Sequence, residues 1–478
     1  MGSVSEVEVA PLPPGRYESV LSPERAAEFR QDLERAEGVF EGRTVWNVNS
    51  TAAGGGVAEM LRSLLSYARG AGVETRWMVM GGNPEFFTVT KRIHNHLHDF
   101  EGDGGELGAS ERRVYEDAVA PSGDELAGLI GARDIVILHD PQTAGLIPRL
   151  KQEGIPVVWR CHVGIDKPGD RTRNAWQFLI DYVKQADAYV FSRRSFAWEG
   201  LDTARTVLIA PSIDAFSPKN SDMDETSARA VLMAAGLVGG DDLPHEPVFF
   251  RQDGSSASIE HRAEMFEVAP MHVTDRVVLQ VSRWDSLKDP IGVIRGFAEY
   301  VAPHSDAHLL YAGPAVEAVS DDPEGKEVLD HAIRTWKELP DDQRERVHLA
   351  TLPMTDGEEN AAMVNALQRH AFVVVQKSIA EGFGLTVAEA MWKARPVVAS
   401  RIGGIQDQIE DGRTGLLLED PEDLAEYGKA VLSLLHDEAR ARAIGTAAQE
   451  RVRDEFLGTR SLTQYMQLLS GLLKVAPD

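Results

Sequence analysis

The chain has 478 residues, of which 43% are hydrophobic and 26% charged, and its formal net charge is -26 at pH 7. This length predicts two or three domains, and the acidity argues against broad binding to nucleic acids or to anionic membranes. A small anionic ligand stays compatible with the acidity, because a local cluster of Arg and Lys can bind one. The one cysteine, Cys161, excludes an internal disulfide and a thiolate metal cluster, and we expect it to be a buried small residue. Since no apolar run is long enough to span a membrane and no signal-peptide pattern is present, we expect a cytoplasmic location.

Residues 1–40 are polar and contain prolines, and a short helix is expected from Pro23. We interpret this segment as an extension that covers the first domain. The stretch "TVWNVNSTAAGGGVAEMLRSLL" follows, in which Thr44 to Val48 predicts a short buried strand and the residues after the triple glycine at 54–56 predict a helix. Unpaired N–H groups and the positive end of the helix dipole at such a turn suit a phosphate or a sugar hydroxyl. The spacing matches neither the dinucleotide fingerprint nor a Walker A loop, so a tight structural turn and an anion site both stay open.

Short apolar runs alternate with helical patterns along the rest of the chain. The clearest runs are "DIVILHD", "PVVWRCHV", "AYVFSR", "RVVLQVSR", "HLLYAGP", "RVHLATLP" and "AFVVVQKS". Continuous apolar strands separated by amphipathic helices predict an α/β fold with parallel sheets covered on both faces. The stretch "APSIDAFSPKN" (210–220) predicts a domain boundary, and residues 221–273 are interpreted as a linker and a mobile or variable segment. Two such sheets joined by a hinge predict a cleft, with ligands at the carboxyl ends of the strands.

Histidines and an aspartate follow two predicted strands of the first half. "LHDPQ" places His139 and Asp140 at a strand end, and "WRCHVGID" places His162 at another. These side chains are suitable hydroxyl partners for a sugar, although a lone histidine is as often a structural residue. Histidines 94, 96 and 98 in "KRIHNHLHDFEGDGG" are interpreted as alternating residues of a loop, which more often bind no metal.

The most informative stretch of the second half is "QKSIAEGFGLTVAEAMWKARPVVASRIGG". It predicts a strand that ends at about Gln376, a loop with Glu381, and a helix that starts near Leu385. The N–H groups of the first helical turn suit a diphosphate. Glu389 lies inside that helix, and Thr386-x-x-Glu389 also fits a capping box, which requires no ligand.

A pair of cations follows another predicted strand, in "VSRWDSLKDP". Arg283 and Lys288 at the carboxyl end of a strand can neutralise a pyrophosphate, Arg in a forked geometry and Lys as a point charge. The alternative is surface ion pairing with Asp285 or Asp289. Acidic residues outnumber basic ones 75 to 49, which makes such pairing common on this chain.

At these residues the sequence resembles a known family. E-G-F-G-L-T-V-x-E, an E-x7-E pattern, resembles the retaining GT-B glycosyltransferases of family 4, from about residue 41 to near the end of the chain. "WNVNSTAAGGGVAEML", "HDPQ", "WRCHVGID" and "SRWDSLKDP" are similar to the trehalose glycosyltransferring synthases and the related retaining trehalose phosphorylases. The resemblance implies a GT-B fold, with two Rossmann-like parallel-sheet domains and an inter-domain cleft. The acceptor domain would span residues 41–213 and the nucleotide-sugar domain 214–457, with a final helix at about 458–478 that crosses back to the first.

The resemblance also implies roles for residues of the second half. Arg283 and Lys288 would hold the diphosphate and stabilise the departing nucleoside diphosphate. Glu381 would bind hydroxyls of the donor sugar, and Glu389 the ribose. The backbone N–H groups that would assist Glu381 are those of Gly382, Phe383, Gly384 and Leu385.

In the first half, Gly55 and Gly56 would lie under the donor phosphate and the acceptor. His162 would contact the donor glucose, and Asp140, with Asn49 and His162, would line the acceptor site. The catalytic set implied is Arg283, Lys288, Glu381 and His162.

The implied reaction transfers glucose from ADP-, UDP- or GDP-glucose to free glucose and gives α,α-trehalose with retention. A phosphate oxygen serves as the base, so catalysis is positioning and charge stabilisation, with no enzyme nucleophile, no metal and no cofactor required. The partners expected are small molecules, and a homodimer is expected by analogy. A phosphorylase that uses glucose 1-phosphate shares the fold and is the main alternative. A sugar-binding protein of the same fold without turnover is the third.

Overall fold

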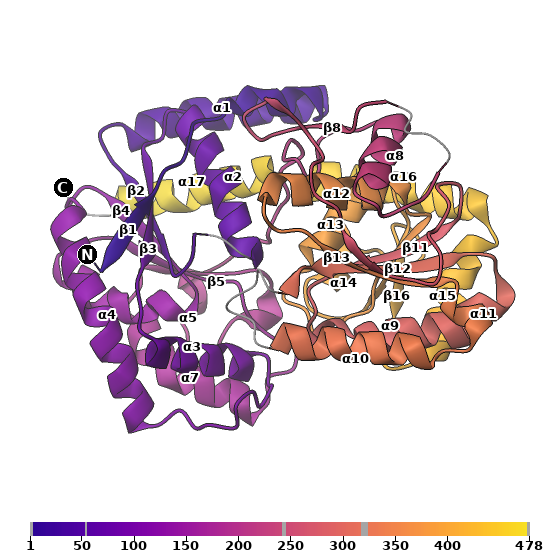
Figure 1. Ribbon diagram of the computed structural model, residues 1–478. Helices are drawn as coiled ribbons and strands as arrows, with labels where there is room; N and C mark the ends of the chain where they lie inside the picture. Colours follow the sequence, from indigo (N-terminus) through magenta and orange to yellow (C-terminus); the bar gives the residue numbers. More distant parts are fainter. Residues whose placement is uncertain (1–2, 53–54, 241–244, 317–323, 476–478) are drawn as a thin grey trace. The chain divides into compact units, whose positions relative to one another are not determined.

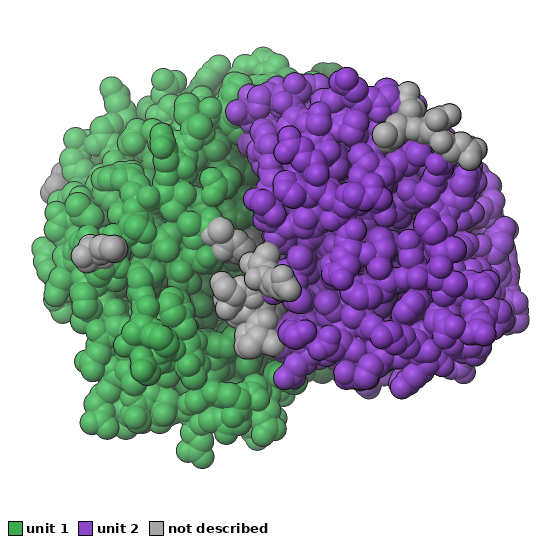
Figure 2. Space-filling view, viewed as in Figure 1, with its two compact units in different colours: residues 1–212, 456–478 green, residues 213–455 purple. Residues whose placement is uncertain are grey.

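The computed structural model of the chain describes residues 3–52, 55–240, 245–316 and 324–475 (Figure 1). The chain divides into two compact units, residues 1–212 with 456–478 and residues 213–455, which Figure 2 colours separately. Each unit contains one seven-stranded sheet flanked by helices. The predicted α/β class with two largely parallel sheets is therefore confirmed. None of the described helices is both long and apolar enough to cross a membrane.

The sheet of the first unit has the order β1-β3-β2-β4-β5-β6-β7, and all neighbours run parallel except β1 and β3. Every residue of β2, β4, β5 and β6 is buried, which is why these strands read as continuous apolar runs. Cys161 at the end of β5 is buried as expected. The strands are β1 (Val4–Val7), β2 (Val45–Asn49), β3 (Thr75–Met80), β4 (Ile135–His139), β5 (Val157–Cys161), β6 (Ala188–Phe191) and β7 (Thr206–Leu208).

Helices cover this sheet, and the last helix of the chain belongs to the same unit. That helix, α17 (Gly458–Val475), packs against α1 and α2 (Figure 1). The other helices of this unit are α1 (Pro23–Phe40), α2 (Gly55–Gly70), α3 (Pro84–Leu97), α4 (Ala109–Leu129), α5 (Asp140–Thr143), α6 (Ile147–Gln152) and α7 (Asp170–Val183).

The N-terminal segment is more regular than its composition indicates. The helix expected from Pro23 is 18 residues long, with Ser22 accepting a hydrogen bond from the backbone N–H of Arg25 at 3.3 Å. Before it, β1 adds an antiparallel edge strand to β3, which the sequence did not predict. A strand of four residues with polar neighbours on both sides offers too little period-2 pattern to be recognised.

The histidines at 94, 96 and 98 do not form a loop, and that expectation was wrong. His94 and His96 lie in α3, and His98 is the residue that caps its C-terminus. Because residues four apart lie on one face of a helix, the rings of His94 and His98 pack together with their centroids 5.1 Å apart.

The sheet of the second unit has the order β10-β13-β12-β11-β14-β15-β16, parallel throughout except for the antiparallel pairing of β10 with β13. Its strands are β10 (Glu264–Phe266), β11 (Val277–Val281), β12 (His308–Pro314), β13 (Val347–Leu352), β14 (Val373–Gln376), β15 (Val397–Ser400) and β16 (Leu416–Leu418). The helices of at least seven residues are α8 (Glu225–Ala234), α9 (Pro290–Gly296), α10 (Glu324–Glu338), α12 (Gly357–His370), α13 (Leu385–Trp392), α15 (Leu424–Leu435) and α16 (Glu438–Glu455).

The interpretation of residues 221–273 as a linker and a mobile segment is wrong for the described part of that range. It contains α8, which packs against α12, a hairpin of β8 (Val248–Phe250) and β9 (Ser256–Ser258), and the edge strand β10. The hairpin is fastened to the start of α12, where Arg251 donates to Glu358 at 3.0 Å and to Asp356 at 2.5 Å. Each of these strands is only three residues long, which is too short to show a period-2 pattern, and the residues between them are mostly polar.

Candidate active site

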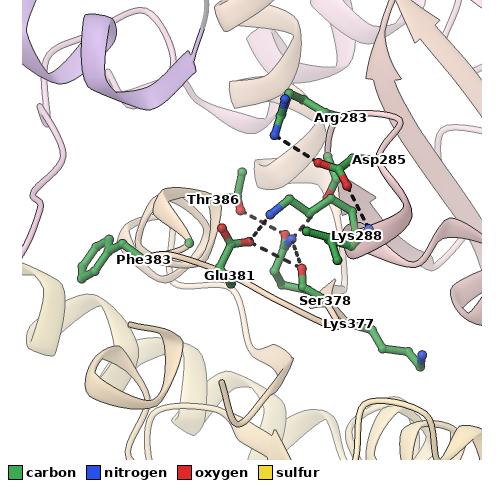
Figure 3. Close-up of polar contacts among 12 residues, drawn as sticks. Arg283, Asp285, Lys288, Lys377, Ser378, Glu381, Phe383 and Thr386 are labelled. Atoms are coloured by element: carbon green, nitrogen blue, oxygen red, sulfur yellow. Dashed lines mark hydrogen bonds and ion pairs between the residues drawn. The ribbon is translucent and has the colours of Figure 1, made fainter. Parts of the chain in front are cut away.

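Lys288 and Glu381, two of the predicted residues, form an ion pair with each other. Lys288 ends a short 3-10 helix, Ser286–Lys288, that follows β11, and Glu381 lies in the loop after β14, the neighbouring strand. The ammonium of Lys288 lies 2.7 Å from Glu381 Oε2, and each side chain is only 14% exposed (Figure 3). Parallel strands bring their carboxyl ends to one edge of the sheet, which is why residues 93 positions apart meet.

Arg283 follows β11 and points toward Asp285 (Figure 3). Its guanidinium donates to Asp285 Oδ2 at 3.1 Å, and 51% of its side chain is exposed. The surface-pairing alternative considered for Arg283 therefore does occur, with Asp285. Asp285 in turn accepts the backbone N–H of Leu287 at 2.8 Å, which fixes the turn that carries Lys288.

A third cation, Lys377, directly follows β14 and is fully buried. It pairs with Asp289, whose carboxylate also accepts the backbone N–H of Gly292 at the start of α9. Asp289 has a φ of 49°, in the left-handed region that non-glycine residues seldom adopt. The three cations and three carboxylates of this edge, Arg283, Lys288, Lys377, Asp285, Asp289 and Glu381, balance one another.

The loop from Glu381 to Gly384 is held by its close approach to two other glycines. Gly384 has a φ of 81° and is the residue before α13, a conformation that favours glycine. A Cβ at Gly403 would lie 1.9 Å from the backbone oxygen of Glu381, and the backbone N–H of Gly404 donates to Gly382 at 2.8 Å. The Gln408 amide donates to the carbonyl of Phe383 at 2.5 Å. The carboxylate of Glu381 is therefore carried by a rigid backbone.

The capping box proposed for Thr386 and Glu389 does not form. The residue before α13 is Gly384, so Thr386 lies inside the first turn rather than at the cap. Its hydroxyl instead donates to Gln376 Oε1 at 3.0 Å, and the Gln376 amide donates to Ser282 and Ser378. These bonds join the ends of β11 and β14 to α13.

Glu389 is 2% exposed and lies 3.7 Å from the ammonium of Lys219. Lys219 lies in "SPKN", in the segment between β7 and α8, and was not predicted to be a site residue. A buried carboxylate is stable in a protein when a cation faces it. The structural reason for Glu389 is thus an ion pair and not a cap.

In the first unit, His139 and His162 belong to a hydrogen-bonded set that crosses four adjacent strands. We define this strand-end network as Asn47, His139, Arg160, His162 and Ser192, which come from β2, β4, β5 and the residues directly after β5 and β6. His139 Nε2 lies 3.1 Å from Asn47 Oδ1, and His139 Nδ1 lies 3.1 Å from His162 Nε2. Arg160 contacts His162 Nδ1 at 3.4 Å and Ser192 at 3.1 Å.

Burial lowers the pKa of His139 to about 3, and the charge of Arg160 acts in the same direction. The pKa of His162 lies well below its ordinary value for the same two reasons, first burial and then Arg160, with a smaller effect of His139. Both imidazoles are therefore neutral at neutral pH.

Asp140 follows β4 in a strained conformation. Its φ is 66°, and the backbone is held there because its carbonyl accepts from the Trp159 indole at 3.2 Å and its Oδ1 accepts the backbone N–H of His162 at 2.8 Å. Burial raises the pKa of this carboxyl to about 6, against the opposing effects of the His162 hydrogen bond and the Arg160 charge. Strain held by neighbours at a strand end is typical of functional sites.

The remaining predicted residues of the first unit lie at the end of β2 and the start of α2. Asn49 ends β2, accepts from the Trp77 indole at 2.8 Å and donates to the carbonyl of Thr51 at 2.7 Å. Gly55 and Gly56 are the first residues of α2, while Gly54 lies outside the described residues. Their roles stay predictions.

Asn47 and Arg160 were missed by the sequence analysis, although both lie in stretches that it quoted. The signal was present: an asparagine in "VWNVN" and an arginine in "VVWRC" occupy positions of buried parallel strands, where polar side chains are rare. A polar or charged side chain inside such a strand requires a hydrogen-bond partner, and that requirement could have identified both.

Comparison with known proteins identifies the fold and the family of this chain. Residues 47–198 match the family model "Trehalose synthase, N-terminal domain", and residues 261–451 match "Glycosyl transferases group 1". Among solved structures, one described as "Trehalose-6-phosphate from E. coli bound with UDP-2-fluoro glucose" matches with a TM-score of 0.66. It is 13% identical and covers 91% of this chain and 100% of that one, so it shows the fold. These findings define a GT-B glycosyltransferase.

Full-length relatives give the family. The trehalose synthase of Pyrococcus horikoshii is 32% identical over 456 residues, 95% of this chain and 95% of its own. The trehalose synthase of Rubrobacter xylanophilus is 35% identical, over 94% of this chain and 95% of its own. The chain belongs to the trehalose synthase family of retaining GT-B glycosyltransferases.

Gly403→Ala tests whether the Glu381 loop is held by this close approach. We expect the free energy of unfolding to fall by about 3 kcal/mol or more, because the new Cβ would clash with the backbone of Glu381 in addition to the strain of a positive φ. Gly412→Ala is the matched control, because its φ is 76° and nothing lies within 4 Å of its Cβ position. It should cost about 1 kcal/mol. Equal losses in chemical denaturation would show that the contact is unimportant.

Asp140→Asn tests the strain and burial at the end of β4. Asparagine tolerates a positive φ and keeps an acceptor for the His162 N–H, but it carries no charge. The folded-state pKa of about 6 lies above the unfolded value, so the carboxylate destabilises the wild type increasingly as pH rises through 6. We expect the variant to melt at a higher temperature than wild type at about pH 8, with the difference shrinking toward about pH 5. A difference that does not depend on pH would contradict the burial argument.

Proposed function

We propose that this protein is a retaining glucosyltransferase that makes α,α-trehalose from a nucleoside-diphosphate glucose and free glucose. Arg283 and Lys288 bind the diphosphate, Glu381 and the N–H groups of Gly382, Phe383, Gly384 and Leu385 bind the donor sugar, and Glu389 binds the ribose. The observation that carries the proposal is the Lys288–Glu381 pair at the carboxyl ends of two neighbouring strands. It sets a cation and a sugar-binding carboxylate side by side.

A diphosphate can bind here because the ion pairs at this edge of the sheet differ in how readily a phosphate can replace the carboxylate. Half of the Arg283 side chain is exposed, so water screens its pair with Asp285, and its guanidinium is accessible to a phosphate. Lys288 is held by Glu381 and by the turn after β11, so its charge is already in place. The amide dipoles at the start of α13 add a second positive field. Together they stabilise a departing nucleoside diphosphate.

On the acceptor side, Asp140 is suited to bind a glucose hydroxyl. Its Oδ1 is used by His162, while its Oδ2 makes no hydrogen bond with the described residues. Asn49 lies at the end of β2, next to β4 in the sheet. Both ring nitrogens of His162 are engaged within the strand-end network, so its contact with glucose would go through its backbone carbonyl or the edge of its ring. A general-base role of the imidazole is thereby disfavoured, in keeping with a base supplied by the leaving phosphate.

The experiment that tests this proposal supplies ADP-, UDP- and GDP-glucose and glucose 1-phosphate separately, each with glucose. The disaccharide is identified by NMR, which distinguishes the α,α linkage. We expect α,α-trehalose from at least one nucleoside-diphosphate glucose. Product from glucose 1-phosphate alone would make the protein a phosphorylase, and trehalose binding without turnover would make it a non-catalytic relative.

Lys288→Ala tests the diphosphate contact. We expect the affinity for the nucleoside diphosphate, measured by calorimetry, to fall by about tenfold to a hundredfold, because a charge-assisted contact is lost and Glu381 is left facing the anion. The affinity for glucose should be unchanged. Lys326→Ala is the control: Lys326 pairs with Asp330 at 3.6 Å on the exposed face of α10, and its loss should alter neither affinity. Equal effects of the two variants would remove Lys288 from the site.

A further inference from the structure

Arg160 is a buried cation whose surroundings are largely neutral. Its side chain is 1% exposed, and within the described residues it makes no ion pair. Its Nε donates to His162 Nδ1 and its Nη2 donates to Ser192 Oγ, while Nη1 is buried without a hydrogen bond to any described residue. A buried guanidinium with so few partners costs stability, so its presence requires another explanation than packing.

The contacts of Arg160 fix the direction of every hydrogen bond in the strand-end network. Arginine can only donate, so Nδ1 of His162 must be the bare, accepting nitrogen. The proton of His162 is then on Nε2 and is donated to Nδ1 of His139 at 3.1 Å. His139 in turn carries its proton on Nε2 and donates it to Asn47 Oδ1 at 3.1 Å. The two rings are nearly parallel, at 15°, as this alignment requires.

The residue whose ring is held in this way also contacts Asp140. The ring is held from both sides, by Arg160 and by His139, and the backbone N–H of the same residue donates to Asp140 Oδ1 at 2.8 Å. His162 therefore links the two ordered rings, through its side chain, to the strained Asp140, through its backbone N–H. The positive charge of Arg160 also favours the ionised form of Asp140.

We infer that Arg160 is a positioning residue of the acceptor site: it fixes the Nε2–H tautomers of His162 and His139 and thereby aims Asp140 at the sugar. The second half of this inference rests on the proposed function, in which Asp140 binds glucose. The first half concerns the imidazoles alone and can be measured without any substrate.

Arg160→Met tests it, because methionine keeps much of the volume but cannot donate. In the full chain with ¹⁵N-labelled histidine, two-bond ¹H–¹⁵N correlations report which ring nitrogen carries the proton, with His139→Gln and His162→Gln identifying the signals. Wild type should show both residues protonated on Nε2. In Arg160→Met, the Nδ1 signal of His162 should shift to the value of a nitrogen that accepts no hydrogen bond, or His162 should change to the other tautomer. The ring signals of His139 should change with it, because the two rings are hydrogen-bonded. The KM for glucose should rise by about tenfold, with kcat changing less.

Arg112→Met is the control, because Arg112 also bonds to neutral groups of the first unit, Tyr182 and the carbonyl of Phe178, both at 2.9 Å. It should leave both imidazole signals and the KM for glucose as in wild type. Should Arg160→Met fail to fold, Ser192→Ala is the second variant. It removes the acceptor of the Arg160 Nη2 hydrogen bond and should give a smaller shift of the same two imidazole signals.

Unchanged imidazole signals in the folded variant would overturn the inference, whatever the activity of the wild type. Shifted signals with an unchanged KM would overturn the link to the sugar. Failure of the wild type to form trehalose from any donor, with the expected imidazole pattern present, would instead count against the proposed function.

Discussion

The ion pair of Lys288 and Glu381 is the interaction on which the proposed donor site depends. Two mostly buried charges at the ends of adjacent strands are costly to desolvate, and they are stable together because each supplies the other's counter-charge. Their backbone supports are rigid: Asp285 fixes the turn below Lys288, and Gly403 and Gly404 press against the Glu381 loop. A site prepared in this way needs little rearrangement when charge develops on a leaving phosphate, which is the physical basis of electrostatic catalysis.

In the first unit, the corresponding strand ends carry mainly neutral hydrogen-bonding groups. Its strand-end network contains one permanent charge, the guanidinium of Arg160, which can only donate hydrogen bonds. It orders the protons of two histidines and forms no ion pair with any described residue. Asp140 is the group that this order serves in our account. Its positive φ and its raised pKa both indicate that the folded protein tolerates an unfavourable residue here, which proteins generally do where a ligand binds.

Much of this could be predicted from the sequence, and the failures have physical causes. The buried parallel strands were predicted from their apolar runs, and the glycine-rich loops after two of them predicted the helix starts at Gly55 and Leu385. The short edge strands β1 and β10 were not predicted, because their formation depends on pairing with a strand far along the chain. The capping box that was the alternative to ribose binding for Glu389 does not form, because Gly384 is the residue before α13. The partner of Glu389, Lys219, could be found only from the fold. Arg160 was visible as a charge in a strand, but its effect on proton positions required coordinates.

The measurement that tests the central claim most directly is a crystal structure of the chain with a bound nucleoside-diphosphate glucose. The account predicts a phosphate oxygen within about 3 Å of the Lys288 ammonium and a glucose hydroxyl at a similar distance from Glu381. A nucleotide sugar bound elsewhere, with Lys288 and Glu381 still engaged only with each other, would contradict it.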